Sequence, residues 1–220
     1  MIRSVFICVG VACLFASIAA AADKPASKVT LKLAPSTLET KTFDPRKLPD
    51  PAPPIHPPEA ACCVSDFDAK IQLSYNTEEQ GPVAGLGQAT GTITAIEATI
   101  TLKFVIWLPK NASADLKAHE DGHRQITQRI YDAAEPGLRK LLEGYIGKTF
   151  DGRGADAMDK AATATGNEIT KACINHLGGP SGRVNTIYDE ITNHSMKKNP
   201  PAAKAIEQAF EQYAAEQKGK

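Results

Sequence analysis

The sequence predicts an α+β domain in which antiparallel strands come first and a helical half follows. Residues of alternating polarity dominate the first half of the chain, whereas apolar residues in the second half recur at helical spacing. Strands and helices are therefore segregated along the chain, and this order is typical of the α+β class. The chain has 220 residues, of which 42 % are hydrophobic, and this is enough for one domain with its own core.

Residues 1–22 have the features of a secretory signal peptide. A basic start, Met1-Ile2-Arg3, precedes an apolar run from Val5 to Ile18 and the small residues Ala19 to Ala22. The apolar run is shorter than the roughly 20 residues that a membrane span needs. We therefore expect a secreted or periplasmic protein of the bacterial cell envelope, with no membrane span after the signal peptide is cleaved.

Residues 23–67 are expected to form an N-terminal strand and a proline-rich linker, followed by the main domain at 68–220. Val29, Leu31 and Leu33 alternate with polar residues, which predicts a half-buried strand. Between Asp44 and Pro58 stand seven prolines. Because proline cannot donate a hydrogen bond to a sheet, this segment should be an extended surface connection.

The main domain is predicted to begin with strands and to continue with helices. Strands are expected at Lys70–Tyr75 and Thr92–Leu108, where apolar and polar residues alternate. Asn111 or Ser113 can then cap a helix that runs to about Ala134. The remaining predicted helices are Pro136–Tyr145, Asp156–Leu177, which Gly178-Gly179-Pro180 should close, and Ala202–Ala215.

The first of these helices carries His119-Glu120-Asp121-Gly122-His123, a candidate metal site. Two histidines four residues apart project from the same helical face, so their rings can bind one ion. In this pattern the histidines are zinc ligands and the glutamate takes the proton of the water that the metal activates. The histidines also lie on the apolar stripe of the helix, where a polar cluster needs partners. Zn²⁺ is therefore the expected cofactor, and hydrolysis the expected chemistry.

A catalytic zinc usually has three protein ligands, so a third ligand must come from elsewhere in the chain. His56 lies in the proline-rich segment and His176 ends a predicted helix beside glycines. His194 is therefore the preferred third ligand. Asp189 is the alternative, either as the third ligand or as a carboxylate that accepts a hydrogen bond from a ligand histidine and orients it.

The two motifs together resemble those of the predicted secreted zinc-dependent proteases known as domain of unknown function 922. The resemblance covers roughly Asp68 to Ser195. It depends on His-Glu-x-Gly-His after a Trp-Leu-Pro strand end, and on Tyr-Asp-x-x-Thr-x-His roughly sixty residues later. It implies a zincin-like metallopeptidase and carries over to the following positions: His119, Glu120, His123, Tyr188, Asp189, Thr192 and His194. The family pattern commonly continues with glycine, where this chain has Ser195.

Two further residues have a predicted role at the site. Tyr188 is either a catalytic donor to the oxyanion of a tetrahedral intermediate or a packed core tyrosine. Gly122 has no side chain, so another element can approach the metal helix closely at this position.

Charge and cysteine content narrow the choice of partners. The chain has 25 basic and 25 acidic residues, so no net charge attracts it to nucleic acid. Cys62, Cys63 and Cys173 follow the leader. One of the adjacent pair could bridge to Cys173, the pair could bridge to each other, or all could remain reduced. A thiol zinc site is the weaker interpretation, because no spaced Cys-x-x-Cys is present.

The sequence thus predicts a zinc-dependent metalloendopeptidase that cuts a peptide or protein substrate, with Glu120 as the general base. One alternative is a non-catalytic zinc-binding module that uses its helical half to bind an envelope partner. Another is a hydrolase of a different amide or ester. The substrate, the oligomeric state and the disulfide pairing do not follow from the sequence.

Overall fold

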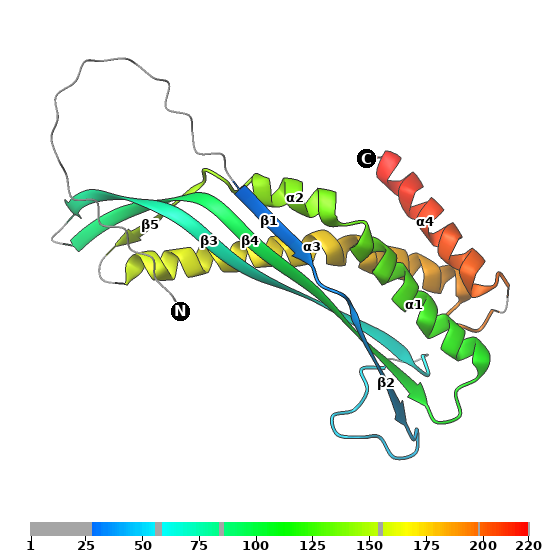
Figure 1. Ribbon diagram of the computed structural model, residues 1–220. Coiled ribbons are helices and arrows are strands. Elements are labelled where there is room, and N and C mark those ends of the chain that lie inside the picture. The colour runs from blue at the N-terminus through cyan, green and yellow to red at the C-terminus, as the bar shows by residue number, and fades with distance from the viewer. Residues whose placement is uncertain (1–27, 56–58, 84–85, 154–155, 198, 220) are drawn as a thin grey trace.

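The structure, a computed structural model, describes residues 28–55, 59–83, 86–153, 156–197 and 199–219. The predicted signal peptide lies outside the described residues. The elements in chain order are β1 (Lys28–Leu33), β2 (Thr37–Phe43), β3 (Cys62–Val83), β4 (Leu86–Pro109), α1 (Ala114–Asp132), α2 (Glu135–Glu143), β5 (Thr149–Arg153), α3 (Ala157–Thr192) and α4 (Ala202–Lys218). The chain therefore has the predicted α+β order, with two strands that were not predicted: β2 among the N-terminal strands and β5 between helices (Figure 1).

The sheet is built around β4, the longest strand. β3 runs antiparallel to β4 along most of its length, from Cys62 opposite Trp107 to Val83 opposite Leu86. The other edge of β4 is shared by β5, β1 and β2, which pair with successive stretches of it. The N-terminal strands were expected to be antiparallel, and this is wrong for β1, which runs parallel to β4, as does the unpredicted β2. Alternating polarity shows that a strand is half-buried, but it contains no information on the direction of the partner strand.

The helices cover one face of the sheet, and the main core lies between them. α1, α2 and α3 lie along the twisted sheet, and α4 packs on α1 and α3 on the side away from it (Figure 1). The predicted alternation of β4 is confirmed, because Ile100, Leu102 and Phe104 are buried while Thr101 and Lys103 are exposed. A second apolar cluster joins α1, α3 and α4, and includes Ile126, Val184, Tyr188 and Ile206.

Helix α3 continues through Gly178-Gly179-Pro180, so the predicted end at Leu177 is wrong. A proline inside a helix costs about 3 kcal/mol, since it removes a hydrogen bond and crowds the preceding turn. Packing offsets this cost: Leu177, Ser181, Val184 and Tyr188 are all buried at helical spacing on the same face. As a result, one continuous helix brings the second motif next to α1.

Within the described residues, no helix is both long enough and apolar enough to cross a membrane.

Candidate metal centre

Helix α1 begins and ends close to the predicted positions and buries the face that carries the first motif. Ser113 caps it by accepting a hydrogen bond from the backbone N–H of Leu116 at 3.1 Å. His119 is 7 % exposed and Glu120 4 % exposed, although both are polar. Burial of such groups is unfavourable unless they are paired, so this face of α1 must have polar partners.

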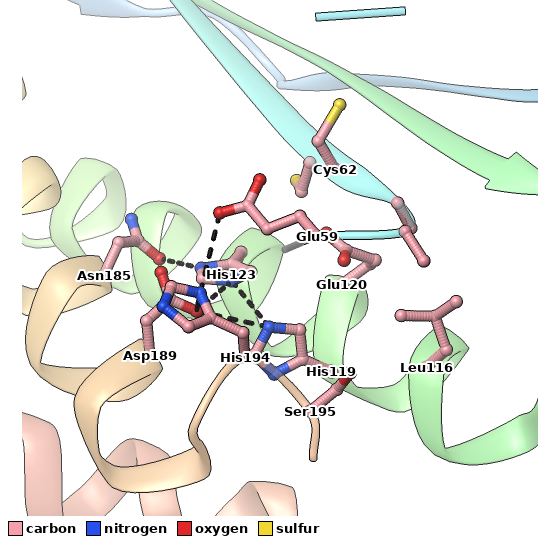
Figure 2. A pocket seen from close by; sticks show the side chains of 13 residues that line it. Glu59, Cys62, Leu116, His119, Glu120, His123, Asn185, Asp189, His194 and Ser195 are labelled. Carbon is pink, nitrogen blue, oxygen red and sulfur yellow. Dashed lines mark hydrogen bonds and ion pairs between the residues drawn. The ribbon is translucent and has the colours of Figure 1, made fainter. Parts of the chain in front are cut away.

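Those partners come from α3, and three ligand atoms meet between the two helices (Figure 2). Nε2 of His119 and Nε2 of His123 are 3.1 Å apart. Oδ1 of Asp189 lies 3.2 Å from the first nitrogen and 3.1 Å from the second. Ligands at about 2.0–2.1 Å from one tetrahedral metal ion are separated by about 3.3 Å, so this triangle is small enough to surround one metal ion.

Two polar side chains of α3 contact Nδ1 of the two histidine rings and fix their orientation. Nδ1 of His123 donates to Oδ1 of Asn185 at 2.8 Å, and the Asn185 amide nitrogen donates to the Ser181 carbonyl at 2.9 Å. The Thr192 hydroxyl donates to the Tyr188 carbonyl at 2.8 Å and lies 3.4 Å from Nδ1 of His119. Both Nδ1 atoms therefore face acceptors and carry the protons, which leaves the lone pair of each Nε2 pointing toward Asp189.

Three hydrogen-bond acceptors converge when both rings are neutral, and either a proton or a metal ion among them would relieve their repulsion. Oδ1 of Asp189 is buried and has no hydrogen-bond partner in the described structure, although both ring nitrogens lie within 3.2 Å. Acceptors held this close repel one another unless a positive charge lies among them. The residues thus fit a metal ion: His119, His123 and Asp189 could hold one.

The pKa shifts of the site residues also favour a positive charge at this position. Burial favours the neutral form of both Asp189 and His123. The contacts with His119 and His123 nevertheless keep the pKa of Asp189 below its ordinary value, and those with Asp189 raise the pKa of His123. A proton on His123 is thus favoured where a cation would bind. Metal binding should release this proton and should weaken as the pH falls.

Glu120 lies beside the ligand triangle and is held by the start of β3. Burial raises its pKa to about 7, and the charges of Asp189 and Glu59 add to this effect. The charge of His123 and a hydrogen bond from the backbone N–H of Cys63 oppose the shift. A carboxyl group with a pKa near neutrality can both accept and donate a proton, as general acid–base catalysis requires.

His194 enters the same pocket from a tight turn after α3. Asn193, His194 and Ser195 all have left-handed backbone conformations, with φ of 48°, 51° and 68°. Such conformations cost of order 1–3 kcal/mol each in non-glycine residues and persist mainly where the surroundings enforce them. The turn brings Nδ1 of His194 to 3.8 Å from Oδ1 of Asp189 and 3.6 Å from Oε1 of Glu59. His194 thus belongs to a second group with Glu59 and Asp189 that could hold a metal ion.

The pocket around these groups has a volume of about 210 Å³ and opens to solvent. Its walls are the metal-helix face of α1, the end of α3 with the following turn, and the segment that leads into β3. Glu59 and Cys62 come from this last segment and face the histidines across the pocket (Figure 2).

Tyr188 lies beneath the ligand residues. Its ring stacks on His119 with centroids 5.0 Å apart and meets the edge of His123 at 5.1 Å. Its hydroxyl is buried and donates to the His119 carbonyl at 3.4 Å. This position matches the packed-tyrosine alternative, because the hydroxyl is directed at the backbone of α1.

Gly122 makes this packing possible, as its sequence position predicted. A Cβ atom at Gly122 would lie 2.6 Å from Cζ of Tyr188 and even closer to the hydroxyl oxygen. The aromatic ring therefore occupies the space that a side chain would fill.

Gly122→Ala should destabilise the protein by about 1–3 kcal/mol, despite the better helix propensity of alanine, because a fully buried ring must move. Gly166→Ala is the matched control: it lies inside α3 with no atom within 4 Å of its Cβ position, so this substitution should stabilise by up to about 1 kcal/mol. Chemical denaturation measures both effects. Tyr188→Phe should partly rescue Gly122→Ala, and equal stability of Gly122→Ala and the wild type would contradict this account of the packing.

The described cysteines are all free thiols, so of the three alternatives the reduced one is found. Cys62 and Cys63 line the pocket, whereas Cys173 is buried in the main core. Burial and the charge of Glu120 raise the pKa of Cys62 to about 11 and that of Cys63 to about 12. Zinc binds thiolates, so protonated thiols at these positions do not favour a cysteine site.

Asn185 and Glu59 are the site residues that the sequence did not single out. Asn185 stands four residues before Asp189, so a helix continued past Gly178-Gly179-Pro180 would have placed them on one face. Glu59 follows the proline-rich segment, and nothing in its local sequence indicates that it reaches the pocket.

No protein-family model, no curated protein and no solved structure matches this chain.

Proposed function

We propose that the protein is a secreted or periplasmic zinc metallopeptidase with a zincin-like site. The observation that carries this proposal is the convergence of two Nε2 atoms and one carboxylate oxygen within 3.1–3.2 Å of one another. Two imidazoles and one carboxylate, with an open side toward a pocket, are a donor set typical of catalytic zinc. The peptidase assignment is further supported by the resemblance to the family of domain of unknown function 922.

The contacts favour Asp189 as the third ligand over His194. Oδ1 of Asp189 forms a compact triangle with the two ring nitrogens of α1, whereas Nδ1 of His194 lies 3.8 Å from this oxygen and groups with Glu59 instead of the two α1 histidines. Oδ1 of Asp189 is already close enough to both ring nitrogens for the three atoms to coordinate one ion without side-chain movement. We therefore assign zinc to His119, His123 and Asp189.

The chain's own residues would divide the hydrolysis between them. When bound, zinc supplies Lewis acidity that activates water near neutral pH and polarises a substrate carbonyl. Glu120 accepts the proton of the attacking water and later donates it to the leaving amine. Asn185 and Thr192 hold the two imidazoles in the tautomer that keeps Nε2 available. Tyr188 supports the ring of His119 and is a positioning residue.

Cleavage of unfolded protein by the zinc-loaded chain tests this function. Fluorescently labelled casein and a peptide library should be cleaved, a chelator should stop cleavage, and added zinc should restore it. If the protein binds zinc tightly but cleaves neither peptides nor casein, the peptidase proposal fails. Hydrolysis of ester or non-peptide amide substrates would then favour another kind of hydrolase. If these substrates are not hydrolysed either, a non-catalytic zinc-binding module is favoured.

A further inference from the structure

His194 places a ring nitrogen that has no hydrogen-bond partner next to the carboxylate oxygen that also faces His119 and His123. Nδ1 of His194 and Oδ1 of Asp189 are both buried, and neither has a hydrogen-bond partner in the described structure. They lie 3.8 Å apart. Nearly all buried polar atoms in proteins have partners, so the unpartnered ring nitrogen of His194, beside a carboxylate oxygen, indicates a ligand at this place.

Glu59 completes this second group from the opposite wall of the pocket. Its Oε1 lies 3.6 Å from Nδ1 of His194, too far for a hydrogen bond. The ligand atoms of Glu59, Asp189 and His194 nevertheless all lie within 4.8 Å of one another. The group therefore encloses a space suited to an ion, and a direct ion pair between Glu59 and His194 does not fill it.

The lining of the pocket is acidic and offers few opposite charges. Three carboxylates line it, those of Glu59, Glu120 and Asp189. Among the described residues of the lining there is no lysine and no arginine. An ion held by His119, His123 and Asp189 leaves the Glu59 carboxylate facing the pocket with no lysine or arginine of the lining beside it. Carboxylates in a confined pocket favour a further cation.

We propose that Glu59, Asp189 and His194 bind a second divalent transition-metal ion, and that Asp189 is shared between this ion and the one held by His119 and His123. A carboxylate shared in this way is compatible with the separation of about 3.5–4 Å between the metals of two-metal hydrolases. Two carboxylates and one imidazole suit Zn²⁺ or Mn²⁺. The side chains of His194 and Glu59 are 36 % and 35 % exposed, which leaves the open side of this ion accessible to solvent and substrate.

The second site does not require that the protein be a peptidase, so its test is metal content and not activity. Metal-free protein is titrated with Zn²⁺, freed of unbound ion by gel filtration, and analysed by mass spectrometry of the metal, with calorimetry for the affinities. The wild type should hold two zinc ions per chain. Glu59→Gln and His194→Ala should each hold one zinc ion per chain. In both variants the affinity of the second, weaker site should fall at least 100-fold, and the affinity of the first, tighter site should stay nearly unchanged.

His176→Ala is the matched control, because His176 is exposed and packs beside Gly137 outside the pocket. It should retain two ions. Circular dichroism reports whether each variant is folded, and Glu59→Gln decides the outcome if His194→Ala does not fold. A single zinc ion in the saturated wild type overturns the proposal. So does the loss of both ions in His194→Ala, which would make His194 a ligand of the first metal.

Discussion

Asp189→Ala should lower the affinity for the first zinc ion roughly a thousandfold, because zinc binding worth about 10–16 kcal/mol is divided among three or four ligands. Asp189 supplies the one carboxylate of the triangle, with Oδ1 at 3.1–3.2 Å from both ring nitrogens. Without it, two neutral imidazoles on α1 remain. Two imidazoles are too few to hold zinc tightly in competition with water.

Glu190→Ala is the matched control for this variant. Glu190 is the next residue of α3, but it is directed away from the pocket and forms an ion pair with Arg183 at 3.5 Å. Its removal should leave zinc affinity unchanged. Competition with a chromophoric chelator measures both constants. Undiminished affinity in Asp189→Ala would return the third-ligand role to His194, the ligand that the sequence favoured.

The local part of the site could be predicted from the sequence, because helical geometry alone determines it. His119 and His123 are four residues apart on a helix whose cap and apolar stripe are visible in the sequence. Their side chains must therefore share one face. The close approach at Gly122 could also be anticipated, although not its partner Tyr188.

The long-range part could not be predicted, since it depends on how α3 ends. On a continuous ideal helix, Asp189 and His194 would point in different directions. The left-handed turn at Asn193, His194 and Ser195 folds the chain back and brings both into the same pocket. Local propensity also ended α3 at Gly178-Gly179-Pro180, whereas burial of Ser181 and Val184 keeps it intact. Tertiary packing outweighed local propensity there.

Glu120→Gln should lower turnover of a cleavable peptide by about 10²–10⁴-fold and lower zinc affinity far less, since it removes the proton acceptor and a nearby charge but not a ligand. Gln is nearly isosteric, and its carbonyl oxygen can still accept the hydrogen bond from the backbone N–H of Cys63. Steady-state kinetics together with metal analysis separate the two effects. If Glu120→Gln retains full turnover, Glu120 is not the general base.

The same substitution should stabilise the metal-free protein, and the sign follows from the pKa of Glu120. Folding raises this pKa from 4.5 to about 7, mainly through burial. Below pH 4.5 the carboxyl group is neutral in both states and costs nothing. As the pH rises from 4.5 to 7 the unfolded state ionises first, and stability falls by on the order of 3 kcal/mol. The Glu120→Gln variant has no carboxyl group at this position and does not lose this stability. Chemical denaturation should therefore show a higher free energy of unfolding for the variant than for the wild type above pH 7, and equal values near pH 4.

A gain in stability that coincides with a loss of turnover would distinguish a functional carboxylate from a structural one. If Glu120 had a structural role, Glu120→Gln would destabilise the protein, because the contacts of the carboxylate would contribute more free energy than its burial costs. A catalytic Glu120 is instead held at an energetic cost in the metal-free fold, and zinc beside it repays part of that cost through its charge. Adding zinc should therefore narrow the difference in stability between the wild type and Glu120→Gln above pH 7.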